Sequence, residues 1–197
     1  MFLHTTVLFF SHSLIVRNHF FLSNNLNIEK RLVEKAIQHD RIAQKTIFEN
    51  YYIQMFNTAF RIVKKEELAL DVVQEAFIKV FKYIHTFEFR STLFSWMKKI
   101  LINEALRLLK DDLKFESNIN ETFEEVIEWQ DSLTGEYLLN AILKLPDGYR
   151  AVFILIEIEG YNHREVAEML NISVGTSKSQ LFYAKKTLQK HLSDLKE

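Results

Sequence analysis

Residues 162–181 read NHREVAEMLNISVGTSKSQL, and in them two helical patterns flank a short polar turn. Asn162 can cap the first helix, and Glu165 three residues later completes a capping box. Residues 171–173 form the turn, after which a second helix is predicted to run to Leu192. Two helices joined by a turn of three to four residues, with a polar and basic second helix, describe a helix-turn-helix.

The first turn of the second helix of such a motif enters the major groove of duplex DNA, where polar side chains contact phosphates and base edges. The side chains suited to these contacts are Ser173, Thr176, Lys178, Ser179 and Gln180. Further outward positions are Tyr183 and Lys186, whereas the residues expected to face inward are Val174, Ser177, Leu181, Ala184 and Leu188. An ordinary helical hairpin is the alternative, but the cap, the small Ala167 and the polar cluster favour a DNA-binding motif.

The composition favours helices throughout the chain. Its 197 residues include 4 Gly, 1 Pro and no Cys, and 48% are hydrophobic. Few turn-forming residues argue against a β-rich fold, and the lack of Cys excludes disulfides and thiolate metal sites. No glycine-rich phosphate-binding motif occurs, and the seven His are scattered. The sequence therefore predicts an all-α protein that is not an enzyme, with no catalytic residues, no cofactor and no bound metal.

Charge is distributed unevenly, although the formal net charge is −1. Residues 27–110 hold 15 basic and 10 acidic residues, whereas residues 111–136 hold 9 acidic residues and a single Lys. The segment after them is nearly neutral. We therefore expect two small helical domains, an N-terminal bundle at 28–110 and the helix-turn-helix domain at 137–197, joined by a flexible acidic linker at 111–136.

Residues 1–27 are apolar but interrupted by polar side chains. A membrane-spanning helix needs about 20 mostly apolar residues, and a signal peptide begins with basic residues and ends at a small-residue cleavage site. The segment has neither pattern. It is interpreted as a leader, either poorly ordered or translated from a start codon chosen upstream of the true one. No other stretch could cross a bilayer, so no stable membrane insertion is expected.

Two helices are predicted at 42–63 and 67–85, and the aromatic side chains of the first are expected mostly in the core. In the second, the apolar side chains fall on one helical face. The opposite face carries Asp71, Gln74, Glu75, Ile78 and Lys82. Such a face is usually just solvated, but an exposed Ile78 among polar residues also suits docking of a partner helix.

An aromatic loop at 83–92 precedes a helix predicted at 93–110, with Ser91 or Thr92 as its cap. Aromatic rings beside basic side chains suit unstacked bases, which favours a nucleic-acid role for Phe87, Phe89 and Arg90. A core position is the competing explanation and fits Phe87 well. One face of the following helix carries an aromatic and mainly cationic stripe, formed by Trp96, Lys99, Asn103, Arg107 and Lys110. Its cations can track phosphates, and its Asn can contact a base edge.

Taken in order, these motifs resemble those of the extracytoplasmic-function sigma factors, a class of two-domain bacterial transcription initiation factors. Residues 71–77, DVVQEAF, resemble the polymerase-binding helix of the family. Residues 87–103 resemble the stretch that melts and reads the minus-ten element, although Phe89 stands where the loop often has Gly. Residues 145–188 resemble the domain that reads the minus-thirty-five element, with Ser177 in place of an inward apolar residue.

The resemblance implies that the chain binds core RNA polymerase and promoter DNA in the cytoplasm, and that an anti-sigma factor is a further partner. It assigns polymerase binding to the polar face of residues 71–82, minus-ten binding to the aromatic loop and cationic stripe, and minus-thirty-five binding to Arg164 and the outward residues of the helix-turn-helix. The acidic linker is either a solvated tether or a mimic of nucleic acid in the RNA channel of the enzyme. The alternative function is a helix-turn-helix regulator that binds DNA without polymerase.

Overall fold

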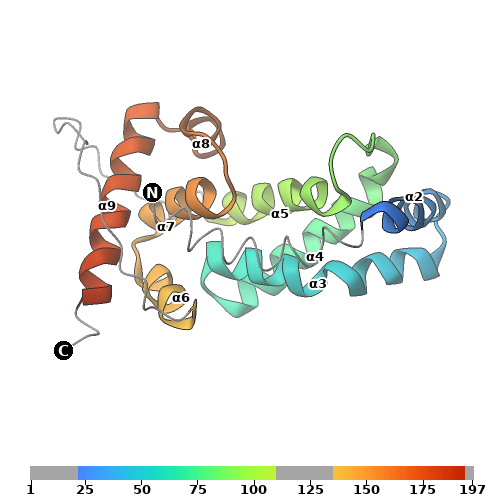
Figure 1. The fold of residues 1–197 in the computed structure, drawn as a ribbon, viewed down its shortest axis with the longest axis horizontal. Helices are drawn as coiled ribbons and strands as arrows, with labels where there is room; N and C mark the ends of the chain where they lie inside the picture. Colours follow the sequence, from blue (N-terminus) through green and yellow to red (C-terminus); the bar gives the residue numbers. More distant parts are fainter. Residues whose placement is uncertain (1–21, 110–134, 194–197) are drawn as a thin grey trace. The chain divides into compact units, whose positions relative to one another are not determined.

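The computed structural model describes residues 22–109 and 135–193, which belong to two compact units. In these ranges all regular secondary structure is helical, as predicted for an all-α protein (Figure 1). The first unit contains α2 (Leu22–Ile37), α3 (Arg41–Val63), α4 (Glu66–Tyr83), a 3₁₀ turn (Ile84–Thr86) and α5 (Leu93–Leu109). The second contains α6 (Gly135–Lys144), α7 (Asp147–Phe153), a π-turn (Ile154–Ile158), α8 (His163–Leu170) and α9 (Val174–Ser193).

Helix α2 begins at Leu22, whereas the N-terminal bundle was predicted to begin at residue 28, so the last part of the expected leader is helical. Its first residues include Ser and Asn, which are weak helix formers, but neither Pro nor Gly interrupts the chain there. Residues 1–21 of the expected leader, and the expected linker up to residue 134, lie outside the described residues. Among the described helices, none has the length and apolar content needed to span a bilayer.

Side-chain caps fix the starts of the helices that matter for function. The Asp40 carboxylate accepts hydrogen bonds from the N–H groups of Ile42 and Ala43, which starts α3. The Thr92 hydroxyl accepts from the N–H of Ser95 at 3.1 Å, so Thr92 is the cap predicted for α5. Local sequence therefore sets where the long helices begin.

The core of the first unit lies where α4 packs against α3, with α5 supplying further buried side chains. The face of α4 predicted to be apolar is buried, with Val73, Ala76 and Phe77 at most 4% exposed. The aromatics of α3 differ from the prediction, because they do not form the core. Phe48 is 39% exposed, and the rings that follow at every fourth residue are only half-buried: Tyr52, Phe56 and Phe60.

In the second unit, α9 packs against α6, α7 and α8. Buried side chains from all four helices form the core between them, among them Ile142, Phe153, Val166 and Leu188. Arg150 is also buried, and its guanidinium donates to the Leu145 carbonyl and pairs with Asp147. Because buried cations need partners, these contacts explain how α7 holds an arginine inside a small domain.

Candidate nucleic-acid interface

The face of α4 proposed to dock a partner helix lies away from the core. Its side chains are all exposed: Asp71, Gln74, Glu75, Ile78 and Lys82. Ile78 is 54% exposed, whereas Val80 and Ala76 on the other side of the helix are fully buried. The face therefore combines the exposed apolar side chain of Ile78 with carboxylate, amide and ammonium groups, and a partner helix could contact both kinds of group.

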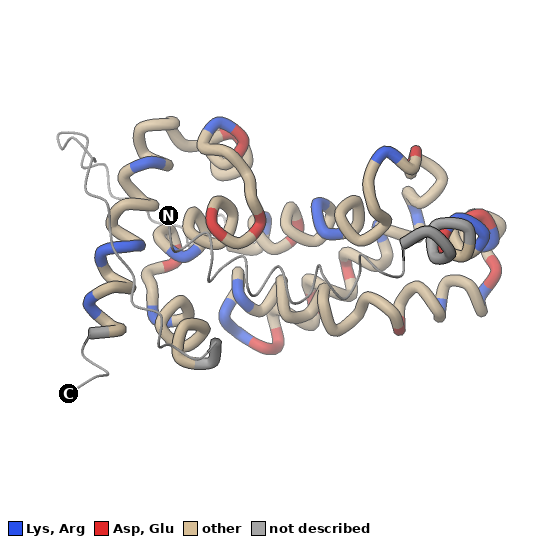
Figure 2. Tube along the Cα trace, in the orientation of Figure 1, with Lys and Arg blue, Asp and Glu red and all other residues tan. Residues whose placement is uncertain are grey.

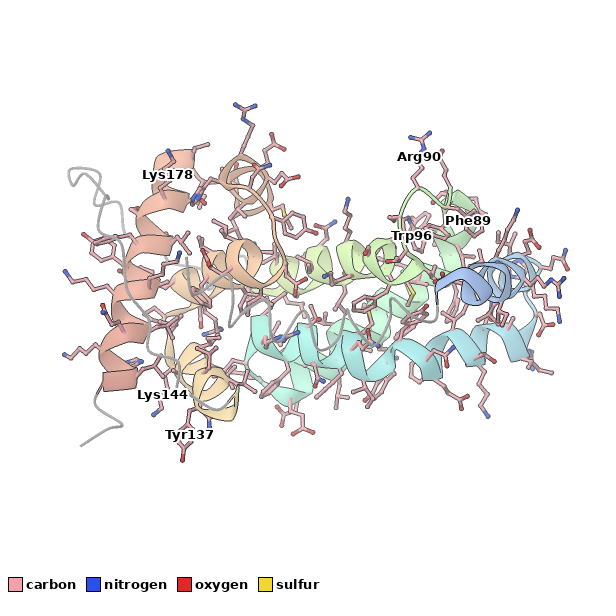
Figure 3. All side chains as sticks on the ribbon, in the orientation of Figure 1. Phe89, Arg90, Trp96, Tyr137, Lys144 and Lys178 are labelled. Carbon is pink, nitrogen blue, oxygen red and sulfur yellow. The ribbon has the colours of Figure 1, made fainter. Side chains whose placement is uncertain are left out.

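The aromatic loop presents one ring to solvent and holds another inside. Phe89 is 45% exposed, and its φ is 57°, in the left-handed region that side chains with a Cβ rarely adopt. Figure 3 shows Phe89 and Arg90 at the tip of this loop, with Trp96 of α5 beneath them. Arg90 pairs with Glu88 at 2.9 Å, and both side chains are largely exposed. The loop therefore presents an aromatic ring and a cation side by side at the surface of the unit, as the predicted contact with an unpaired base needs.

Phe87 does not share this exposure, which corrects its prediction as a direct DNA contact. Its side chain is only 6% exposed, and its ring centroid lies 4.7 Å from that of Phe89 and 5.5 Å from that of Trp96. The ring fills the space under the loop, which is the core position that the sequence also allowed for Phe87. We assign Phe87 the role of supporting the two aromatic rings that flank it.

The stripe along α5 is accessible where the structure describes it. Lys99, Asn103 and Arg107 are exposed and Trp96 is half-buried, whereas Lys110 lies outside the described residues. The inward side of the helix contains Leu93, Met97 and Leu101, whereas Ile100 and Leu108 are only half-buried. Lys99 and Arg107, which could contact phosphates, and Asn103, which could contact a base edge, therefore lie on one side of the helix that follows the aromatic loop.

A buried carboxylate behind this stripe was not predicted. Glu104 is 5% exposed and binds Lys79 of α4 and, at 3.1 Å, the Nε of Arg107. Burial alone would raise the pKa of Glu104, but the hydrogen bonds and charges of its two cations outweigh burial and hold that pKa below its ordinary value. The signal was present in the sequence, because Glu104 shares the helical phase of the inward residues Met97 and Leu101.

The helix-turn-helix is built by its caps. Asn162 and Glu165 form the predicted capping box at the start of α8. Asn171 ends α8 in the left-handed conformation, and the Ser173 hydroxyl then accepts from the N–H of Thr176 at 2.9 Å to start α9. Arg164, Ser173 and Lys178 are exposed and Thr176 is half-buried. Figure 3 shows Lys178 on the first turns of α9.

Two predicted contacts in α9 are wrong, because the helix is enclosed on more sides than its polarity indicates. Ser179 is 3% exposed, and its hydroxyl donates to the Thr176 carbonyl at 2.9 Å. Gln180 is fully buried, whereas Val174, expected inside, is 40% exposed. Contacts with α6, α7 and α8 together bury a broader arc of α9 than a two-helix hairpin would.

The remaining outward residues of α9 combine aromatic and cationic groups. Tyr183 stacks on Tyr149 of α7, and Lys186 Nζ lies 5.9 Å from the ring centroid of Phe182. Figure 2 shows cationic positions along α9, which has no Asp or Glu between residues 174 and 193. The exposed cations of this helix suit contact with the DNA backbone.

A second unpredicted feature joins α8 to α9. His163 Nδ1 lies 2.9 Å from the hydroxyl oxygen of Ser177, which is fully buried. Ser177 replaces the inward apolar residue that is usual at this position, and its partner His163 could not be predicted from the sequence. Burial first, and then the charge of Lys178, lower the pKa of His163 below its ordinary value.

Comparison with known protein families matches both units. Residues 47–114 match the family model of sigma-70 region 2, and residues 135–188 match that of sigma-70 region 4. The chain is 28% identical over 182 residues to the ECF RNA polymerase sigma factor SigW of Bacillus subtilis (strain 168), covering 84% of this chain and 97% of SigW. It is 30% identical over 139 residues to the RNA polymerase sigma factor SigV of the same organism, covering 70% of this chain and 84% of SigV.

A similar fold occurs in a solved structure of a sigma factor. The co-crystal structure of RpoE with the anti-sigma factor NepR from Bartonella quintana matches with a TM-score of 0.50 and 24% identity. The match covers 76% of this chain and 96% of that chain. It supports the helical fold described above.

Proposed function

Because this chain belongs to the extracytoplasmic-function class of RNA polymerase sigma factors, we propose how its surfaces divide the work of transcription initiation. The exposed face of α4 binds core RNA polymerase. The aromatic loop and α5 hold the melted minus-ten strand, and α8 and α9 bind the minus-thirty-five duplex. Catalysis is left to the polymerase, and the chain acts in the cytoplasm beside it.

This assignment of roles is supported by the different side chains of the two surfaces that are proposed to bind DNA. Phe89 and Arg90 offer a ring and a cation without a groove-reading helix, which suits an unpaired base. Lys178 and Thr176 instead project from the first turns of a helix, which suits the major groove of a duplex. A protein with both surfaces holds DNA that is melted in one place and paired in another.

The proposed minus-thirty-five contacts are the accessible residues of the helix-turn-helix. They are Arg164, Ser173, Thr176, Lys178, Tyr183 and Lys186. Ser179 and Gln180 are removed from this set because they are buried. They stabilise the position of α9 rather than touch DNA.

An anti-sigma factor is a further proposed partner. The RpoE structure with NepR shows that a protein of similar fold binds one. The half-buried aromatics of α3 and the exposed Ile78 of α4 are apolar surface that such a protein can cover. A partner seated on α4 would exclude core polymerase, and it would thereby silence initiation.

Run-off transcription tests the proposal. Purified chain and core RNA polymerase are incubated with a promoter library, and specific start sites are expected only when both are present. A regulator that acts without polymerase would bind DNA but form no complex with the core enzyme. Failure to assemble that complex would reject the proposed function in favour of this alternative.

The docking face has a sharper test in Ile78→Glu. A carboxylate in place of the exposed Ile78 is expected to weaken core binding about tenfold, as for a central interface side chain. Ile42→Glu is the matched control, because Ile42 is 78% exposed near the start of α3. Equal core affinity of the two variants would show that the α4 face is not the binding surface.

A further inference from the structure

The hydrogen bond between α8 and α9 joins two residues that the proposed DNA contacts do not include. His163 is the first residue of α8, and its Nδ1 lies 2.9 Å from the hydroxyl oxygen of Ser177 in α9. Ser177 is fully buried and His163 is half-buried. A buried hydroxyl needs a partner, so the imidazole satisfies Ser177 as well as linking the two helices.

Ser177 lies between two side chains proposed to contact DNA, Thr176 and Lys178. Its backbone N–H donates to the Ser173 carbonyl at 3.0 Å, within the turn that starts α9. Binding geometry is sensitive to displacements of about 0.5 Å. The hydrogen bond from the Ser177 side chain to His163 therefore helps to fix the position of the turn that is proposed to contact DNA.

The charged groups that act on the ring come from two elements: Lys178 and Lys185 on α9, and Glu157 on the π-turn. Glu157 also pairs with Lys185 at 2.8 Å, so its negative charge is shared. Burial and then Lys178 lower the pKa of His163, while Glu157 opposes them in part and Lys185 adds to the lowering. The ring is therefore neutral in the free chain at neutral pH.

Phosphates of a DNA duplex bound beside Lys178 would shift the protonation equilibrium of His163. They bring negative charge close to the ring, and nearby negative charge favours the imidazolium form. A protonated imidazole can only donate, and a serine hydroxyl can accept. The bond to Ser177 is thus retained when the ring takes up a proton.

We propose that His163 is a positioning residue for the DNA-contacting turn of α9, and that binding of duplex DNA is coupled to proton uptake by its ring. The inference rests on the proposed role of α9 and adds a regulation of that same surface. It predicts tighter duplex binding at lower pH, because between the titration midpoints of the ring in the free and in the bound chain only the complex binds the proton.

Fluorescence anisotropy with the full chain and a labelled random-sequence duplex of about 30 base pairs measures the coupling at constant ionic strength. Between about pH 8 and about pH 5.5, the duplex affinity of the unmodified chain is expected to rise about threefold or more. If duplex binding raises the pKa of the ring by one unit, the affinity can rise by at most about tenfold. His163→Gln keeps a hydrogen-bonding side chain but does not titrate, so it should lack this gain. His39→Gln, at an exposed His between α2 and α3 of the first unit, should keep it.

Two further measurements separate positioning from simple stability. NMR of the imidazole should show the titration midpoint of His163 rising when duplex is added. Ser177→Ala should remain folded by circular dichroism but bind duplex several-fold more weakly at about pH 8, since the link from the ring to α9 is lost.

The proposal is overturned if His163→Gln shows the full gain at low pH, if duplex does not raise the midpoint of the ring, or if Ser177→Ala binds as tightly as the unmodified chain. A chain that binds no duplex at any pH would instead contradict the proposed role of α9. The two failures are therefore distinguishable.

Discussion

The aromatic loop and the helix-turn-helix, the two surfaces proposed to bind DNA, are built in opposite ways. In the loop, an exposed ring at Phe89 rests on the buried ring of Phe87, and the support is apolar packing. In the helix-turn-helix, hydrogen bonds from Asn162 and Ser173 fix the helix starts that present polar groups. The difference follows from the ligand: an unpaired base is held by its π face, whereas a duplex is contacted by donors at set positions.

The largest effect is expected when the apolar support beneath Phe89, the ring of Phe87, is removed. Phe87→Ala is expected to cost about 3–5 kcal/mol of unfolding free energy, as for other buried Phe residues, and to abolish promoter opening because Phe89 and Trp96 lose their packing. Urea unfolding and permanganate footprinting of melted DNA measure the two effects. Phe87→Leu, which keeps most of the volume, is the control, and a stable Phe87→Ala chain that still opens promoters would contradict the role assigned to Phe87.

Glu104→Gln tests whether electrostatics also contribute to the first unit. Loss of this carboxylate leaves Lys79 and Arg107 without their shared partner, at a cost of about 1–3 kcal/mol, which is below the value for fully buried pairs because both cations are partly exposed. The pKa of Glu104 is lowered in the folded chain, so its stabilisation is present above the ordinary Glu pKa and is lost as the pH falls through the folded value. Chemical unfolding between about pH 7 and pH 3 should show a smaller acid loss for Glu104→Gln than for the unmodified chain. Equal losses would mean that other groups govern the acid response.

Lys178→Ala tests the proposed phosphate contact between α9 and duplex DNA. Loss of one phosphate contact should weaken duplex binding by up to about tenfold and reduce the slope of log affinity against log salt by about one. Transcription from a pre-melted template should change much less, because the loop is proposed to hold the unpaired strand. An unchanged salt slope would show that Lys178 does not contact the backbone.

The smallest expected effect concerns the polar cap of α9. Ser173→Ala removes the acceptor for the Thr176 N–H and should cost about 1 kcal/mol of unfolding free energy. Ser173→Asp, which also accepts from that N–H, should recover the stability but bind DNA more weakly through charge repulsion. Thermal unfolding and anisotropy measure the two properties separately, and a stable Ser173→Ala chain would deny Ser173 its capping role.

Helical periodicity and caps were sufficient to predict the fold class, most helices and the exposed face of α4. Patterns of this kind depend on neighbours within one helix, and Asn162 with Glu165 or Thr92 with Ser95 are such neighbours. They do not report how many other helices surround a given one. For this reason Ser179 and Gln180 were expected outside although α9 buries them, and the aromatics of α3 were expected inside although they are half-buried.

Pairs that join different helices were also missed. Glu104 meets Lys79 across 25 positions of sequence, and His163 meets Ser177 across 14. A polar residue at an inward helical position indicates that a partner exists, but the sequence does not say which residue supplies it. Only the packing of the helices in three dimensions identifies these partners.

The left-handed backbone at Phe89 has a consequence for how the chain meets melted DNA. A residue with a side chain in this conformation costs about 1–3 kcal/mol, so the chain accepts a less stable loop in order to keep a ring turned outward before any strand arrives. The entropy of ordering that ring is lost during folding rather than during base capture. If the loop binds an unpaired base as proposed, it does so as a preorganised receptor, and the affinity gained in this way is stability that the free protein gives up.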